Sequence, residues 1–159
     1  GRPYPWPKDP SPEIPTLTPE RFEVVERHRA QSICRPDAPP DWPRIFELIA
    51  ELRAMAAARS VPLAVMLIPD EFQVEDSVWE AVRSGPDGEK LDRDLPQRVL
   101  NTWLAQQEIP ALDLLPALRA VMPLADGKRH LYQLRDTHFN ARGNEVAGDE
   151  LGEFLRRWW

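Results

Sequence analysis

The chain has 159 residues and a formal net charge of −6, a size that fits one domain with a substantial core. The negative charge argues against a nucleic-acid partner, because phosphate binding needs a basic surface and the only dense basic cluster is in "FLRRWW". The single cysteine, Cys34, excludes an intramolecular disulfide, and the longest apolar run, "PLAVMLIP", is too short to cross a membrane.

Proline dominates the start of the chain, where residues 1–43 hold eleven of the 18 prolines. Proline lacks a backbone donor and fixes φ, so residues 1–43 are expected to form an extended arm or linker. Within this arm, Thr18-Pro19-Glu20 is typical of a helix start and predicts a helix over residues 19–31. The chain begins with glycine rather than methionine, and we expect it to be processed or to be part of something longer.

The next segment reads as a helix followed by a strand. From Asp41 the apolar residues recur at helical spacing, and the helix is expected to end near Ser60. The apolar run "VPLAVMLIPD" comes directly after it and predicts a buried parallel strand. The predicted apolar face of the helix consists of Ile45, Ile49, Leu52 and Ala56.

The remaining elements continue the alternation. A short helix is predicted in "DSVWEAVRSG", a loop in "GPDGEK", a helix in "LPQRVLNTWLAQQE", and a second strand in "IPALDLL". "PALRAVMP" gives at most two helical turns, and "RHLYQL" a small strand or an ordered loop. A final helix is expected, with a face of Ala147, Leu151, Phe154, Leu155 and Trp158. The order predicts an α/β domain over residues 44–159, with helices packed on a parallel sheet.

The stretch "RDTHFN" stands immediately before the last predicted helix and carries the strongest chemical signal. His138 can accept and return a proton near neutral pH, and Asp136 can hold its other N–H and so fix the tautomer. Asn140 is expected to cap the helix and anchor this loop, and Gly143 to permit close approach of another backbone. Taken alone, Asp-x-His before a capped helix is also compatible with ordinary loop and cap chemistry.

The stretch "LYQLRDTHFNARGNEVAGDELGEFL" resembles the C-terminal block of the SGNH (GDSL-type) hydrolase superfamily. Its Asp-x-His spacing, followed by an aromatic residue, Asn and Gly, is closest in style to SGNH-like domains of the alginate O-acetyltransferase group. The segments "VPLAVMLIPDEFQV" and "PQRVLNTWLAQQEIPALDLLPALRAV" are similar to those that lead to this block, so the resemblance covers roughly residues 44–157. It implies a three-layer, flavodoxin-like fold in which His138 is the general base and Asp136 its orienting carboxylate.

The resemblance also implies a serine that this chain does not supply in the family's pattern. The nucleophile belongs to a Gly-Asp-Ser block after the first strand, and the oxyanion donors belong to two further blocks, all upstream of the matched segments. None of the serines follows a strand in a Gly-Asp-Ser context, and none lies in a Gly-x-Ser-x-Gly elbow. These serines are Ser11, Ser32, Ser60, Ser77 and Ser84.

Other residues are weaker candidates for a functional site. Cys34 with His28 or His138 would make a thiol nucleophile, although its loop has no catalytic pattern. Asp136, His138 and His130 would offer three metal ligands, but the spacing favours neither a metal nor a cofactor. Two more features could bind a partner or line a pocket, namely the pair Trp158-Trp159 and the pair Asp70 and Gln73.

Two hypotheses about function follow from the sequence. The first is the C-terminal part of a serine esterase or O-acetyltransferase that acts on an acyl ester or a carbohydrate, with the serine outside this chain. The second is a non-catalytic binding or assembly module that keeps the His–Asp pair without a nucleophile. Relatives with this Asp-x-His form often act on cell-envelope polysaccharide, so the resemblance slightly favours a bacterial extracytoplasmic location.

Overall fold

The structure is a computed structural model that describes residues 14–158. Among the described residues, two strands stand between groups of helices. In chain order the elements are α1 (Pro19–Ile33), α2 (Trp42–Ala57), β1 (Val65–Leu67), α3 (Glu71–Val74), α4 (Asp76–Arg83), a 3-10 helix (Gly88–Lys90), α5 (Leu95–Gln106), β2 (Ala111–Asp113), α6 (Leu115–Ala120) and α7 (Ala141–Trp158).

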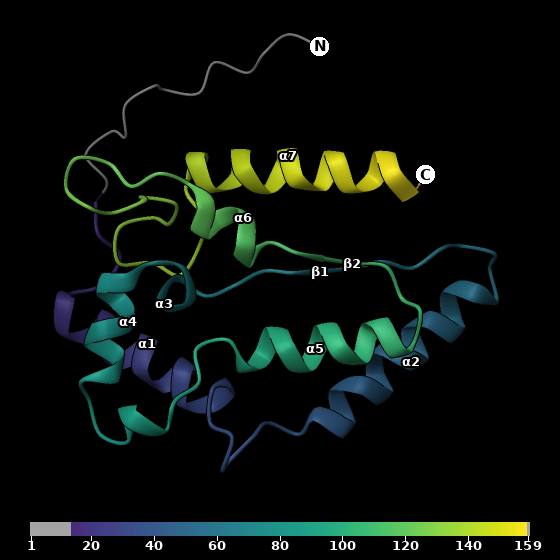
Figure 1. The fold of residues 1–159 in the computed structure, drawn as a ribbon, viewed down its shortest axis with the longest axis horizontal. Coiled ribbons are helices and arrows are strands. Elements are labelled where there is room, and N and C mark those ends of the chain that lie inside the picture. The colour runs from purple at the N-terminus through teal and green to yellow at the C-terminus, as the bar shows by residue number, and fades with distance from the viewer. Residues whose placement is uncertain (1–13, 159) are drawn as a thin grey trace, which may run out of the picture.

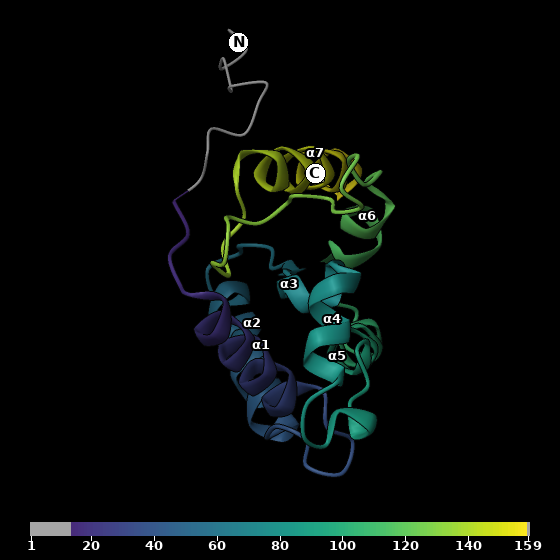
Figure 2. The same cartoon turned by 90° about the vertical axis from the view of Figure 1, so that its left-hand side faces the viewer.

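The two strands form a parallel pair, with Val65 opposite Ala111 and Leu67 opposite Asp113. Helix α7 lies over one face of this pair, while α5 and α2 lie over the other (Figure 1). In the view turned by 90°, α7 again lies at the top, with α1, α2, α4 and α5 in the lower part of the molecule and α3 and α6 between (Figure 2). The predicted α/β class, with helices packed on a parallel sheet, is confirmed at this level.

Local signals set the helix starts as predicted. The Thr18 hydroxyl accepts a hydrogen bond from the Arg21 N–H at 3.3 Å and begins α1, with proline next in the chain. The Asp41 carboxylate accepts from the Arg44 N–H at 3.1 Å and begins α2 in the same way. The short helix α3 was not predicted, because four residues are too few to show helical periodicity.

The predicted arm is only partly within the described structure. Residues 1–13, which include Tyr4 and Trp6, lie outside the described residues. Further along, α1 packs against α3 and α4, and it buries Glu26 and Ala30 in that contact. Residues 19–33 are therefore a packed helix within the predicted arm, while the domain boundary at residue 43 stays a prediction.

Within residues 14–158 the core has three apolar clusters, which lie under different elements. One packs α6 and the loop before α7 against α3, a second packs α1 against α4, and a third packs α5 against the strands. The buried members of the first cluster are Val74, Leu114, Leu115, Leu118, Leu131 and Tyr132. Because this cluster holds the loop before α7, it fixes the position of the predicted site.

One flank of the sheet is apolar and uncovered among residues 14–158. Strand β1 pairs only with β2 there, and the side chains of Met66 and Ile68 are exposed. Helix α2 has no buried residue, and its Leu52, which belongs to the predicted apolar face, is 56% exposed. Parallel sheets normally have helices or further strands over both faces and edges, so this flank is unusual for a parallel pair.

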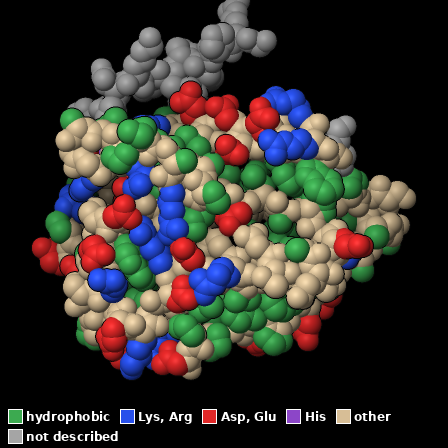
Figure 3. Space-filling view, in the orientation of Figure 1, with side chains coloured by type: hydrophobic (Ala, Val, Ile, Leu, Met, Phe, Trp, Pro, Cys, Tyr) green, Lys and Arg blue, Asp and Glu red, His purple; other side chains and the backbone are tan. Residues whose placement is uncertain are grey.

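A search of the described helices found none with the length and apolar character needed to span a bilayer. The face of the molecule in Figure 3 carries Lys and Arg interspersed with Asp and Glu.

Candidate functional site

The loop that carries His138 is tied to the carboxyl end of the sheet. Tyr132 is buried, and its hydroxyl donates a hydrogen bond to the Pro69 carbonyl, two residues beyond β1, at 2.9 Å. The Tyr132 ring also packs on Phe139, with 5.0 Å between ring centroids, and the two residues form an isolated antiparallel bridge. The loop therefore begins and ends at the paired residues Tyr132 and Phe139, and residues 133–138 project from this fixed point.

Asn140 and Gly143 hold the base of this loop. The Asn140 side-chain amide donates to the carbonyls of His130 and Tyr132 at 2.8 and 3.1 Å, and its oxygen accepts from the Gly143 N–H at 3.1 Å. Asn140 thus caps α7 and joins both sides of the loop. At Gly143 a Cβ would overlap the Leu131 carbonyl, so only glycine allows this approach of two backbones.

Asp136 and His138 form a hydrogen-bonded pair. The His138 Nδ1 lies 2.5 Å from the Asp136 Oδ1, and the His138 backbone N–H donates to the same oxygen at 3.1 Å. The hydrogen bond from His138 holds the pKa of Asp136 below its ordinary value, so this carboxyl is an anion that only accepts. The neutral imidazole therefore carries its proton on Nδ1, which leaves Nε2 as a base.

Thr16 completes the surroundings of Asp136, although no motif in the sequence indicates this role. Its hydroxyl donates to the Asp136 Oδ2 at 2.8 Å, and its N–H donates to the Leu134 carbonyl at 3.4 Å. The two residues are 120 positions apart, in segments with no shared pattern. Both oxygens of Asp136 are therefore occupied, which restricts rotation of the carboxylate.

The two members of the pair differ in exposure. The Asp136 side chain is 18% exposed, whereas the His138 side chain is 79% exposed. One nitrogen of the His138 ring is hydrogen-bonded to a carboxylate, and most of the ring is exposed. This is the geometry that a general base needs in order to act on another group. Catalysis by His138 and Asp136 remains a prediction.

No described serine is the partner of His138. Ser32 and Ser84 donate instead to carbonyls of their own helices, those of His28 and Ala81, at 2.8 and 2.9 Å. Across residues 14–158, no serine, threonine or cysteine side chain hydrogen-bonds to the His138 ring. Ser11 lies outside the described residues.

Cys34 has the surroundings of a core residue. Its side chain is fully buried in the cluster between α1 and α4, and burial raises the pKa of its thiol to about 12. A thiol nucleophile needs a lowered pKa and access to substrate, so this environment disfavours the thiol reading.

The other histidine proposed as a metal ligand is engaged in a turn. His130 Nε2 lies 2.6 Å from the Asp126 carboxylate. In the part of the chain that the structure describes, no three His, Cys, Asp or Glu side chains are arranged to hold a metal ion.

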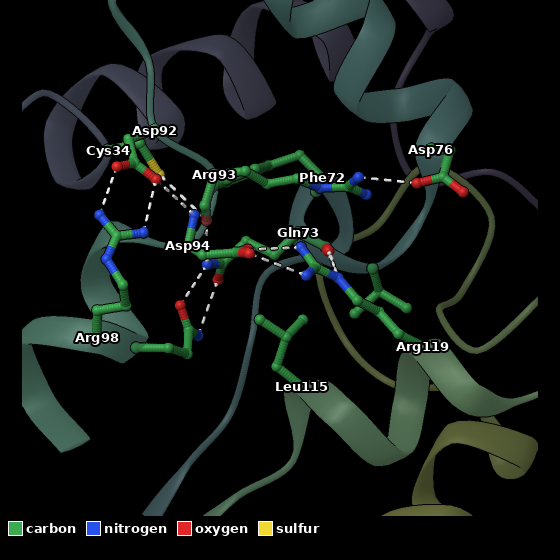
Figure 4. A network of polar contacts seen from close by, with 12 residues as sticks. Cys34, Phe72, Gln73, Asp76, Asp92, Arg93, Asp94, Arg98, Leu115 and Arg119 are labelled. Atoms are coloured by element: carbon green, nitrogen blue, oxygen red, sulfur yellow. Dashed lines mark hydrogen bonds and ion pairs between the residues drawn. The ribbon is translucent and has the colours of Figure 1, made fainter.

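Gln73 takes part in an internal polar network (Figure 4), and the Asp70 backbone N–H donates to the Gln73 side-chain oxygen at 3.1 Å. Gln73 is buried, and its amide donates to the Arg93 carbonyl at 2.9 Å and to the Gln97 side chain at 2.6 Å. Arg119 donates through Nε to the Gln73 carbonyl and through both terminal nitrogens to Asp94. Asp70 pairs with Arg29, so the network joins α1, α3, α5 and α6.

A cavity of about 700 Å³ lies behind the His138 loop. Its walls come from α1, the α3–α4 segment and residues 128–135, and they include Glu26, Glu71 and Tyr132. Neither Asp136 nor His138 lines it. The sequence did not predict this cavity, because it forms between segments that are far apart in the chain.

The C-terminal tryptophans are only partly described. Trp158 is 56% exposed and lies against Phe154 of the same helix, with 6.2 Å between ring centroids. Trp159 lies outside the described residues.

Comparison of the chain with protein-family models, with curated proteins and with solved structures found no match.

Proposed function

We propose that this chain supplies the histidine and aspartate of an SGNH-like serine esterase or O-acetyltransferase. The observation that supports the proposal most is the Asp136–His138 pair, with a distance of 2.5 Å from Nδ1 to Oδ1 and an exposed imidazole. This is the relation between base and orienting acid in Ser-His-Asp catalysis. The finer fold that we propose is the SGNH, flavodoxin-like three-layer fold.

In this proposal a serine hydroxyl attacks the carbonyl carbon of an acyl ester while His138 Nε2 takes the hydroxyl proton. Asp136 stabilises the imidazolium that forms and keeps the ring in place. His138 then donates the proton to the departing alcohol, which leaves an acyl-serine. Water or a carbohydrate hydroxyl, deprotonated by His138, attacks the acyl group and releases the serine.

The serine and the oxyanion donors would come from polypeptide outside this chain. The free edge of β1 supports this part of the proposal, since β1 pairs only with β2 among residues 14–158 and a further parallel strand could pair with its other edge. Such a strand would also bring its carboxyl end to the side of the sheet where Tyr132 ties the His138 loop.

The first test is to read the parent reading frame upstream of Gly1 for a strand followed by Gly-Asp-Ser. The joined protein is then treated with a fluorophosphonate, which labels activated serines. We expect labelling of that serine in the wild type and in His28→Ala, an exposed histidine on α1, and loss of labelling in His138→Ala. Equal labelling in all three proteins would refute the role of His138.

A second candidate function has its own supporting observation, namely that no serine among residues 14–158 contacts the His138 ring. On this alternative the chain is a non-catalytic binding or assembly module with the same fold. The absence of an upstream Gly-Asp-Ser segment, together with no labelling of the full parent protein, would favour it over the enzyme.

A further inference from the structure

The cavity behind the His138 loop has an apolar wall and an acidic side. Phe22 of α1 and Val78 and Val82 of α4 line the apolar part. Glu26 of α1 and Glu71 of α3 line the same cavity from its floor. A volume of about 700 Å³ is within the range of pockets that enclose small organic molecules.

Two carboxyl oxygens at this floor have no hydrogen-bond partner among the described residues, and neither has the Nε of Arg135 in the same lining. The two oxygens are Glu26 Oε1 and Glu71 Oε2, and both atoms are buried. The Glu26 side chain is 0% exposed, and its other oxygen accepts from the Phe72 N–H at 3.1 Å. Buried polar atoms in folded proteins nearly always have partners, so two unpartnered oxygens beside one cavity require an explanation.

Lys128 and Arg135 also line the cavity, and Lys128 favours the charged form of Glu71, but among residues 14–158 neither cation forms an ion pair or hydrogen bond with Glu26 or Glu71. Glu75 is occupied by Arg129, whose N–H donates to Oε1 at 2.9 Å and whose guanidinium lies 3.7 Å from Oε2. Asp70, next to Glu71 in the chain, is paired with Arg29. The groups that act on the two floor carboxyls are Arg29, Asp70, Glu75, Lys128 and Asp136, and His130 and Arg135 also line the cavity.

A metal ion does not suit this site, because the described carboxylates do not converge as metal ligands. A larger cation with an apolar part matches the cavity better, since the acidic floor and the apolar wall face one volume. We propose that the cavity binds an organic cation, an ammonium or guanidinium group carried on an apolar body, with its charge beside Glu71. The apolar body would pack on Phe22, Val78 and Val82.

Binding of such a cation is coupled to protons. Burial raises the pKa of Glu71 to about 9, and the charge of the neighbouring Glu26 adds to this effect. Burial also raises the pKa of Glu26 to about 7, and the charge of Asp70 adds to it. Without a ligand Glu71 is therefore protonated at pH 7, and a bound cation would expel that proton. Affinity for the cation should rise with pH up to about pH 9, by at most about tenfold per pH unit for one released proton.

The test measures binding of three probes to the chain by calorimetry between pH 6 and pH 9. The probes are 4-phenylbutylammonium, neutral 4-phenylbutanol and anionic 4-phenylbutanoate, which differ in charge and share one apolar body. We expect the cation to bind best and to gain affinity with pH, while the affinity of the alcohol stays constant. Equal affinity of the cation and the alcohol across this range, or no binding of the cation, would overturn the proposal.

Glu71→Gln keeps the shape of the side chain and removes its charge. The substitution should therefore weaken the affinity for the cation at least tenfold at pH 9 and leave the affinity for the alcohol unchanged. Glu80→Gln, on the exposed side of α4, is the matched control and should bind all probes as the wild type does. Circular dichroism establishes that both variants are folded. Unchanged affinity of the cation in folded Glu71→Gln would refute the proposed site. None of these measurements depends on an esterase activity.

Discussion

At the scale of single residues, Asp136 is the best-held group of the predicted site. His138 occupies one of its oxygens through two hydrogen bonds, and Thr16 occupies the other at 2.8 Å. All three bonds favour the ionised carboxylate, which is the state that an imidazolium partner needs. Thr16 is therefore a positioning residue in the proposed mechanism.

Replacement of Thr16 tests this arrangement without any assay of activity. Thr16→Val removes the hydroxyl donor and should raise the pKa of Asp136, by roughly half a unit for one partly exposed hydrogen bond. Thr16→Ser retains the donor and should keep the pKa of the wild type. Carbon-13 NMR titration of the Asp136 carboxyl measures both variants. A Thr16→Val titration identical to that of the wild type would mean that the hydrogen bond does not form in solution.

At the scale of elements, α7 makes a close backbone contact at its first turn. Gly143 lies against the Leu131 carbonyl, and that contact brings the helix up to the buried residues of the loop. The same helix contains Gly148, where an added Cβ would meet nothing within 4 Å. The two glycines therefore give a matched pair of substitutions in one helix.

Gly143→Ala should lower the free energy of unfolding by about 2–3 kcal/mol, because the methyl group must displace backbone. Gly148→Ala should raise it by about 0.5–1 kcal/mol, since alanine is the better helix former. Urea unfolding of both variants measures the difference. Equal effects from the two substitutions would contradict the close contact at Gly143.

The elements that could be predicted are those with local determinants. The starts of α1 and α2 follow from Thr18 and Asp41, each with a proline nearby, and the apolar periodicity located the long helices. The Asp136–His138 contact was also predictable, because the two residues are two positions apart in one loop. Thr16 is a different case, since its partner lies 120 residues away.

The parts that could not be predicted depend on packing between distant segments. Glu26 illustrates this, since its carboxylate accepts from the Phe72 N–H of α3, 46 residues away. The exposure of Leu52 was also unpredictable, because the periodicity of α2 defines an apolar face and does not say what covers it.

At the scale of the whole molecule, buried carboxyl groups make stability depend on pH in an unusual direction. The pKa values of Glu26 and Glu71 are raised in the folded state to about 7 and about 9. The folded state then binds more protons than the unfolded state above the ordinary pKa of glutamate. Stability contributed by these groups is greatest in mild acid and falls as the pH rises toward 9.

Glu71→Gln should remove most of this dependence. The variant is expected to be more stable than the wild type at pH 8.5, on the order of 1–3 kcal/mol, and to approach it at pH 5. Thermal unfolding across this range gives the comparison. The raised pKa of Glu71 would be contradicted if the stability of the wild type increased between pH 6 and pH 9 and the stability of Glu71→Gln changed with pH in the same way.

The whole molecule also has the feature that connects its fold to the proposed function, namely a His–Asp pair on a loop that is tied to the carboxyl end of a sheet with a free edge among residues 14–158. The most direct measurement is kcat/KM for p-nitrophenyl acetate, using the chain joined to the proposed serine-bearing segment. We expect a loss of roughly 10³-fold or more in His138→Ala and no change in His28→Ala. A His138→Ala protein that retains kcat/KM within twofold of the wild type would contradict the proposed role of His138.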